Sequence, residues 1–244
     1  GLFIARDLEG NWSWIKVLED ETTDVDVDFE GRVIYVGTYG NWIWRGTLTN
    51  TSIEWVNLNP LEPLGLSVDT PPIITEVEVD PYNPDRFWWA SQVKLLNTYP
   101  RREEAPCLSG AAAWDPSSGW LHSFTGKQCS HIAVDRGESM EFTTIIDGVL
   151  GARRAFAGSY SCQSVLVTED GGRTWHATPS LPRGDNIFAV SAVNIGGSEA
   201  IVALCISGIE VSFDYGETWI DEFDVPPGDL EVGLPWKALQ IPKG

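Results

Sequence analysis

The C-terminal half of the chain repeats one octapeptide, Thr168-Glu169-Asp170-Gly171-Gly172-Arg173-Thr174-Trp175 and Ser212-Phe213-Asp214-Tyr215-Gly216-Glu217-Thr218-Trp219. Both copies follow the rule Ser/Thr-x-Asp-x-Gly-x-Thr-Trp, and their tryptophans are 44 residues apart. The hydroxyl and the carboxylate can hydrogen-bond within a tight turn, glycine permits a positive φ, and tryptophan anchors the returning strand in apolar packing. The octapeptide therefore predicts a stapled β-hairpin, and its recurrence predicts a repeat protein.

Three weaker copies extend the repeat toward the N-terminus. Asp is followed five residues later by Trp at Asp7 and Trp12 and at Asp115 and Trp120, and Asn50 with Trp55 fits if Asn replaces Asp. The five tryptophans are separated by 43, 65, 55 and 44 residues. These lengths suit one four-stranded unit per repeat, with insertions in the middle two, and such units predict propeller blades.

The octapeptide resembles the Asp-box, or BNR repeat, of the sialidase-like β-propellers. The run Val77-Glu78-Val79-Asp80-Pro81-Tyr82-Asn83-Pro84-Asp85-Arg86-Phe87-Trp88-Trp89-Ala90 resembles the strand, turn and strand that open blades in this superfamily, and Arg32 to Thr38 resembles the second strand. The resemblance implies that the box residues are structural and lie on the turn between the last two strands of a blade. These residues are Asp7, Trp12, Asn50, Trp55, Asp115, Trp120, Thr168, Asp170, Gly172, Trp175, Ser212, Asp214, Gly216 and Trp219.

The predicted fold is an all-β propeller of about five four-stranded antiparallel blades in a single domain, 1–244. Strand-like runs rich in Val, Ile, Trp and Phe recur between Gly, Pro, Asn and Asp turns, without a long helical periodicity. The predicted blades are 1–17 with 234–241, 24–58, 73–124, 131–178 and 186–223. The first blade is predicted to be closed by the C-terminal strand, unless the repeats belong to a larger ring. The alternative fold is another antiparallel sandwich.

Charge restricts the classes of partner. The chain has 35 acidic and 16 basic residues, a formal net charge of −19, which repels phosphate backbones and anionic lipid. We therefore expect no nucleic-acid partner, and we expect no membrane insertion because no apolar span is long enough. Glycans or a protein partner, an oligomer or a larger assembly remain as expectations.

The four cysteines lack the spacing of a metal site, so no metal or cofactor is expected. Similar positions in neighbouring blades predict a Cys162–Cys205 disulfide, and the flanks of the third box predict Cys107–Cys129; buried thiols are the alternative. Two Asn-x-Ser sequons, at Asn11 and Asn50, favour an extracellular location or a particle surface.

Catalytic signatures are not recognisable in the sequence. The resemblance implies, for a sialidase, three substrate-binding Arg residues, a Tyr and Glu pair, an Asp acid and an Arg-Ile-Pro run; the nearest phrase is Gln240-Ile241-Pro242. Another type of glycoside hydrolase would need two carboxylates facing each other across a cleft. Among 35 acidic residues many such pairs can be proposed, so no pair is a specific signal. The sequence therefore favours a non-enzymatic, non-sialidase module, with a glycoside hydrolase of a propeller family as an alternative.

The chain has twelve tryptophans, and the boxes use only five of them. The remaining tryptophans favour a recognition surface with aromatic faces. Trp42 and Trp44 are predicted on the same side of one strand, whereas Trp88 and Trp89 are predicted on opposite sides, with one of them exposed or both in the core. The predicted functions are binding of carbohydrate or a protein at a loop-bearing face, or a structural role in a virion, tail or filament. The candidate ligand residues are Trp42, Trp44, Trp88, Trp89, Tyr99, Arg101 and Arg102.

Overall fold

The computed structural model describes residues 1–8, 11–28, 30–49, 52–59, 73–92, 110–115, 120–121, 129–134, 143–146, 148–159, 163–183, 186–195, 198–206 and 208–224. Every regular element among these residues is a β-strand, as the alternation of apolar and polar residues predicts. No helix that could cross a membrane is found in the described ranges.

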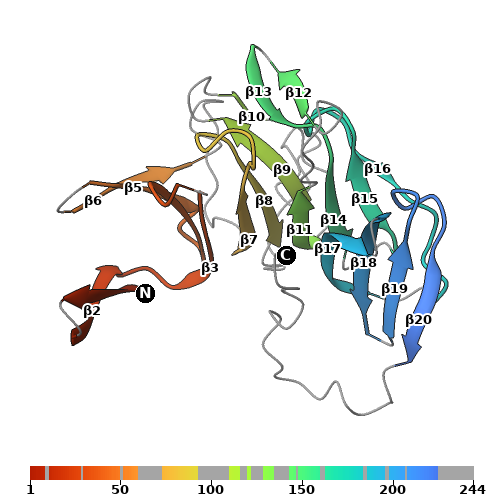
Figure 1. Ribbon diagram of the computed structural model, residues 1–244, viewed down its shortest axis with the longest axis horizontal. Coiled ribbons are helices and arrows are strands. Elements are labelled where there is room, and N and C mark those ends of the chain that lie inside the picture. The colour runs from red at the N-terminus through yellow and green to blue at the C-terminus, as the bar shows by residue number, and fades with distance from the viewer. Residues whose placement is uncertain are drawn as a thin grey trace, which may run out of the picture.

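Four sheets contain four antiparallel strands each, and the strands of each sheet follow one another along the chain, apart from one hairpin inserted in the third (Figure 1). The first comprises β3 (Thr22–Val27), β4 (Val33–Thr38), β5 (Ile43–Leu48) and β6 (Ile53–Leu58). The second comprises β7 (Ile73–Val79), β8 (Phe87–Gln92), β9 (Gly110–Asp115) and β10 (Trp120–Leu121). The third comprises β11 (Cys129–Val134), β14 (Ala155–Ser159), β15 (Val165–Thr168) and β16 (His176–Ala177). The fourth comprises β17 (Ile187–Ile195), β18 (Ser198–Cys205), β19 (Gly208–Ser212) and β20 (Ile220–Asp224).

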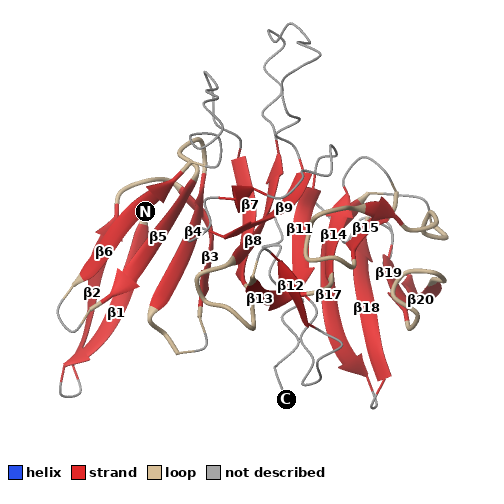
Figure 2. Ribbon diagram, turned by 90° about the horizontal axis from the view of Figure 1, so that it is seen from above, coloured by secondary structure: helices blue, strands red, loops and turns tan. Residues whose placement is uncertain are grey.

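Two hairpins lie outside these sheets. β1 (Leu2–Leu8) pairs with β2 (Asn11–Leu18), and β12 (Thr143–Ile146) pairs with β13 (Val149–Ala152) between the first two strands of the third sheet. Figure 2 shows the four sheets standing side by side. Their first strands β3, β7, β11 and β17 lie on the inner side of an arc, and consecutive first strands contact one another (Figure 1). These sheets are propeller blades, and we number them blades two to five because β1 and β2 belong to the predicted first blade.

The core lies between consecutive blades. Tyr35 and Trp42 of blade two pack with Phe87 and Trp89 of blade three. Trp88, on the opposite side of β8, packs against blade four, and Ile187 of blade five closes a cluster with Phe156. A strand that is covered on both faces explains why β4 and β15 read as continuous apolar runs.

The innermost strands share one irregularity. Each has a β-bulge near its start, at Thr22/Asp24, Ile74/Glu76, Cys129/His131 and Ile187/Ala189. A bulge inserts one residue and increases the local twist. It also provides a fixed reference from which equivalent positions in the four blades can be counted.

The described residues limit two of the sequence predictions. Residues 234–241 lie outside the described part of the chain, so closure of the first blade by this segment stays a prediction. Cys205 is buried in the core between blades four and five, and because Cys162 lies outside the described residues, the Cys162–Cys205 disulfide stays a prediction. Cys107 and Cys162 are outside the described residues, and the Cys107–Cys129 pairing stays a prediction.

Candidate functional site

The two complete boxes form the same hydrogen-bonded turn. The Thr168 hydroxyl donates to Asp170 Oδ1 over 2.9 Å and accepts from Gly172 N over 2.8 Å. Asp170 also accepts from the Thr174 amide and hydroxyl, at 2.9 and 2.6 Å. The second copy repeats these contacts around Asp214, with distances of 2.8, 2.7, 2.8 and 2.6 Å. Both carboxylates are thus occupied by the turn itself.

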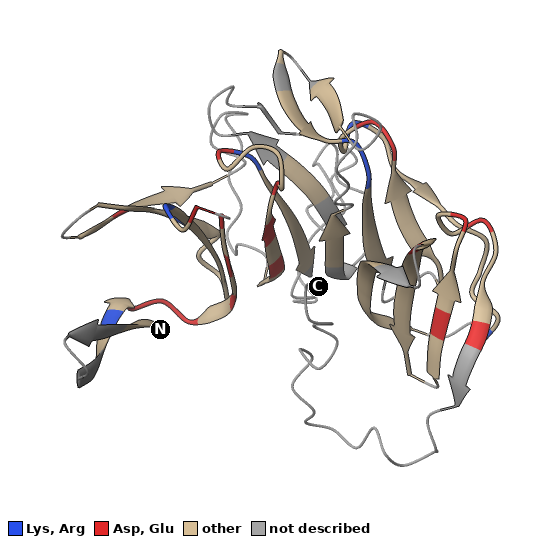
Figure 3. Ribbon diagram, viewed as in Figure 1, with Lys and Arg blue, Asp and Glu red and all other residues tan. Residues whose placement is uncertain are grey.

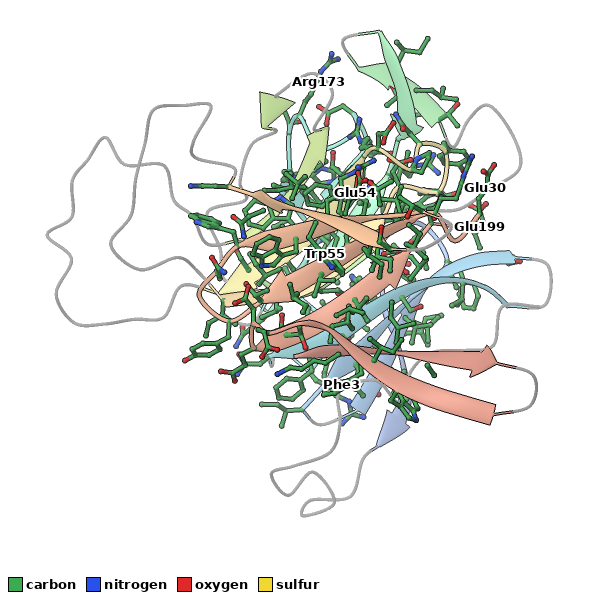
Figure 4. All side chains as sticks on the ribbon, turned by 90° about the vertical axis from the view of Figure 1, so that its left-hand side faces the viewer. Phe3, Glu30, Glu54, Trp55, Arg173 and Glu199 are labelled. Atoms are coloured by element: carbon green, nitrogen blue, oxygen red, sulfur yellow. The ribbon has the colours of Figure 1, made fainter. Side chains whose placement is uncertain are left out.

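The box tryptophans pack toward the core. Trp175 meets Trp88 edge-on, with ring centroids 6.3 Å apart, and Trp219 packs on the core between blades four and five. The weaker copies also bracket hairpins, since Asp7 is the cross-strand partner of Trp12 and Asp115 that of Trp120. Trp55 of β6 is half-buried with its ring against Gly46, whereas Asn50 lies outside the described residues (Figure 4).

Acid should weaken the boxes. Hydrogen bonds from the Thr218 hydroxyl and amide lower the pKa of Asp214; at Asp170, burial alone would raise the pKa, but donors from Thr174 and Thr168 lower it. Each carboxylate therefore stabilises the fold above the unfolded pKa of about 3.9, and this contribution is lost as pH falls through the lower folded pKa. We expect Asp214→Asn to lower Tm at neutral pH and the difference from wild type to shrink below about pH 4. Thermal unfolding across pH tests this, with exposed Glu217→Gln as control; a pH-independent difference would contradict it.

Gly216 is a second test of the box turn. Its φ is +94°, and a Cβ atom there would lie 2.5 Å from Cγ2 of Thr178. We expect Gly216→Ala to destabilise the chain by about 1–3 kcal/mol, measured by urea unfolding. Gly40→Ala is the matched control, because Gly40 has a φ of +85° but no atom near the added Cβ. Equal losses in the two variants would mean that the contact with Thr178 is not important.

Three of the tryptophans predicted to bind ligand lie in the core. Trp42 is 5% exposed and has a φ of 61°, so it precedes β5 in a left-handed turn and does not share a strand face with Trp44. Trp88 and Trp89 do point to opposite sides of β8, but a neighbouring blade covers each side and both are fully buried. Of the two alternatives predicted for this pair, the structure has the one with both tryptophans in the core.

The remaining ligand candidates are separated by the structure. Trp44 is half-buried, and its indole N–H donates to Asp20 Oδ2 over 2.5 Å. Tyr99, Arg101 and Arg102 lie outside the described residues. Trp44 does not lie beside another described candidate on an exposed surface. The described candidates therefore form no aromatic platform for a sugar.

The turn Asp80–Arg86 between β7 and β8 forms an ionic junction. Asp80 is fully buried and accepts hydrogen bonds from Ala152 N, Tyr82 N and the Trp88 indole, at 2.8, 3.0 and 3.0 Å. Arg86, 1% exposed, places Nε 3.3 Å from Asp80 Oδ2 and donates to the Gly171 carbonyl at 2.5 Å. Burial raises the pKa of Asp80, and the Arg86 charge and the N–H donors oppose that shift.

This junction joins three blades. The Tyr35 hydroxyl of blade two donates to the Pro84 carbonyl over 3.0 Å, and Arg45 donates to Asp85 over 2.5 Å. On the other side, Ala152 of β13 and Gly171 of the box turn in blade four are bound directly. The Asp80–Arg86 pair is structural, since both of its charged groups are buried and their partners come from the protein.

The β12–β13 hairpin is mounted on this junction. Ala152 N is bound to Asp80, Gly151 packs against Arg86, and the Asn83 amide donates to the Leu150 carbonyl over 3.3 Å. Farther along the hairpin, Ile145 and Leu150 are cross-strand partners and are 65% and 42% exposed. The hairpin projects from the outer side of the arc in Figure 1. A well-anchored base thus presents an apolar pair to solvent, and this hairpin is the candidate functional site.

Sequence reasoning missed the hairpin, although two signals were present. Asp147-Gly148 between two apolar runs is a strong hairpin signal, and Gly148 has a φ of +86°. The Asp-Pro-x-Asn-Pro turn was read as a blade opening, but its buried charges are visible only in three dimensions.

Acidic residues line the innermost strands of blades two and three. No group of three or more His, Cys, Asp or Glu side chains suited to a metal occurs within the described ranges. Figure 3 shows the acidic bands on β3 and β7. Instead of a cation, these carboxylates bind backbone amides of the next blade: Asp24 to Val77 and Glu78 to Val134, among others.

Solved structures with the same fold are similar to this chain. The WD40 repeats of RRP9 match with a TM-score of 0.56 and 12% identity over 85% of this chain and 52% of theirs, and U3-55K with 0.54 and 11% over 84% and 52%. The GH74 enzyme of Niastella koreensis matches with 0.50 and 13% over 83% and 29%. The fold is a β-propeller. The chain spans about half the length of the first two proteins. Neither a family model nor a curated protein sequence matches it.

Proposed function

We propose that this propeller is a non-enzymatic protein-recognition module that binds its partner through the β12–β13 hairpin. The observation that carries the proposal is the exposed pair Ile145 and Leu150 on a hairpin whose base is bound to the buried Asp80. We also propose that the chain is a non-sialidase member of the Asp-box superfamily, supported by the identical hydrogen bonds of its two complete boxes.

The chemistry of the hairpin favours an apolar protein surface as its target. Removal of apolar surface from water is the dominant favourable contribution to most protein–protein association, so an exposed Ile and Leu pair favours a partner with a complementary apolar surface. Prior fixation of the hairpin reduces the entropy that binding would otherwise cost. Anchoring by Asp80 and Asn83 therefore favours recognition over a merely solvated insertion.

Glycan binding has less support than protein binding. The tryptophans proposed as sugar platforms, Trp42, Trp88 and Trp89, are buried between blades. The carboxylates of Asp24 and Glu78 on the inner strands are bound to backbone amides, so they have less support as a catalytic pair of a hydrolase. An extracellular or particle-surface location remains part of the proposal and has its support in the sequons at Asn11 and Asn50.

Peptide selection tests the proposal directly. A phage-displayed library of random peptides is selected against the wild-type chain, and the enriched peptides are titrated against the Ile145→Asp, Leu150→Asp variant. We expect apolar peptides whose affinity falls by about tenfold or more in the variant, since two central contacts are lost. Val56→Asp is the matched control, because Val56 is 56% exposed on β6 and should leave binding unchanged.

Two results would contradict the proposal. One is peptide binding that the hairpin variant retains in full while circular dichroism shows both proteins folded. The other is tight binding to a defined glycan on an array, together with an absence of enriched peptides. The second result would restore carbohydrate recognition as the better account.

A further inference from the structure

One arginine lies at the base of the β12–β13 hairpin. Arg153 directly follows Ala152, the last residue of β13, and is half-buried. Its Nε donates to the Glu169 carbonyl over 3.1 Å, and its own carbonyl accepts from Gly171 N over 2.8 Å. Figure 3 shows the basic step between β13 and β14 in blue, at the base of the projecting hairpin. Arg153 is therefore held in place by the box turn of blade four.

Ion pairing distinguishes Arg153 from other basic residues of this acidic chain. Arg154, the next residue, places Nε 3.5 Å from Glu169 Oε1 and its guanidinium 4.0 Å from the ring centroid of Tyr215. Arg153 forms no ion pair within the described ranges, and its side chain binds the Glu169 carbonyl instead. The basic side chains that do pair with a carboxylate are Lys16, Arg32, Arg45, Arg86, Arg154 and Arg183.

The guanidinium of Arg153 is suited to bind a carboxylate from a partner. A guanidinium has five N–H donors in a planar fork that matches the two oxygens of a carboxylate. The contact with Glu169 uses Nε, so the Nη groups keep their donors for another acceptor. Fixation of the side chain at Nε reduces the entropy that binding would otherwise cost. The carboxylate of Glu169 does not compete for these donors, because it pairs with Arg154.

The apolar pair and Arg153 are close enough to contact one partner segment. Leu150 and Arg153 are three residues apart, which corresponds to about 10 Å along an extended chain. Ile145, the other exposed residue, is the cross-strand partner of Leu150. A partner in an extended conformation spans the same distance with about three residues. Aliphatic side chains that cover the pair therefore bring a neighbouring side chain of the partner within reach of Arg153.

We propose, on the basis of the function proposed for the β12–β13 hairpin, that the partner presents an aliphatic segment with one carboxylate. The aliphatic side chains bind Ile145 and Leu150, and an Asp or Glu about three residues away binds the guanidinium of Arg153. The net charge of −19 repels acidic proteins in general, so this contact is local. Such a contact contributes to specificity and fixes the register of the segment more than it adds affinity.

Titration of the peptides enriched on the wild-type chain tests the proposal. We expect an Asp or Glu about three residues from the aliphatic side chains, and an affinity about fivefold lower in Arg153→Gln, the upper range for an ion pair near the surface. Gln can still donate to the Glu169 carbonyl. Lys16→Gln is the matched control, because it removes the same charge from β2, outside the four blades, and should leave the affinity unchanged.

A charge exchange separates direct pairing from a structural role of Arg153. Arg153→Glu should weaken binding of the acidic peptide further, and a peptide with Lys in place of its acidic residue should recover affinity for Arg153→Glu. The difference in affinity between wild type and Arg153→Gln should shrink at high salt, because salt screens a surface ion pair.

The result for the hairpin variant shows which of the two proposals fails. Binding that is lost in Ile145→Asp, Leu150→Asp but unchanged in Arg153→Gln would overturn the role of Arg153 and leave the proposed function intact. Enriched peptides without Asp or Glu, or equal weakening in Lys16→Gln, would also overturn that role. Full binding by the Ile145→Asp, Leu150→Asp variant would contradict the proposed function and overturn the role of Arg153 with it.

Discussion

Asp80→Ala should be among the most destabilising single substitutions in this chain. We expect the free energy of unfolding to fall by about 3–5 kcal/mol, the range for removing one partner of a buried ion pair. The substitution leaves the guanidinium of Arg86 buried without its counter-charge and removes the acceptor for Ala152 N and the Trp88 indole. Urea unfolding at neutral pH measures the loss as a lower midpoint with an unchanged slope.

Two further variants test whether the loss of stability in Asp80→Ala depends on the burial of Asp80 and on its pairing with Arg86. Asp85→Ala is the matched control, because Asp85 lies in the same turn and pairs with Arg45 but has a 55% exposed side chain; we expect a loss below about 1 kcal/mol. Asp80→Leu combined with Arg86→Met removes both charges and should recover part of the stability lost in Asp80→Ala. A loss in Asp80→Ala no larger than that in Asp85→Ala would show that the junction does not hold the blades together.

The repeated octapeptide made the fold predictable because its chemistry is local. Every polar contact of Asp170 or Asp214 in the turn involves residues no more than four positions away. A local rule of this kind is visible in the sequence, and its spacing then implies a four-stranded unit. The fold class, a propeller of antiparallel four-stranded blades, was predicted on this basis and is confirmed.

Packing between blades was less accessible from the sequence. The alternation rule correctly put Trp88 and Trp89 on opposite faces of β8, but it could not show that a blade covers each face. The rule failed for Trp42 because a single left-handed residue precedes the strand.

The candidate site was missed for the same physical reason. Ile145 and Leu150 are ordinary strand residues in the sequence, and only the assembled blade shows that their hairpin lies outside the four-stranded sheet. The contact between Asp80 and Ala152 spans 72 residues, so no local pattern indicates it. Sequence periodicity therefore predicts the repeated scaffold better than the insertion that it carries.

Trp89→Ala should have an effect as large as the loss of Asp80. Trp89 is fully buried between blades two and three, in a cluster with Tyr35, Phe87 and Ile74. Removing a buried indole leaves a cavity between two blades, and we expect a loss of about 3–5 kcal/mol in the free energy of unfolding. Chemical unfolding followed by far-ultraviolet circular dichroism measures this without depending on tryptophan fluorescence.

Trp44→Ala is the informative comparison, because Trp44 was predicted to bind ligand in the same way but is only half-buried. Its ring contributes one hydrogen bond to Asp20, so its removal should cost clearly less than the removal of Trp89. Equal losses would mean that the face of blade two bearing Trp44 is covered as completely as the interface between blades two and three. A Trp89→Ala variant with wild-type stability would contradict the packing of blade two against blade three, on which the position of the junction and of the hairpin depends.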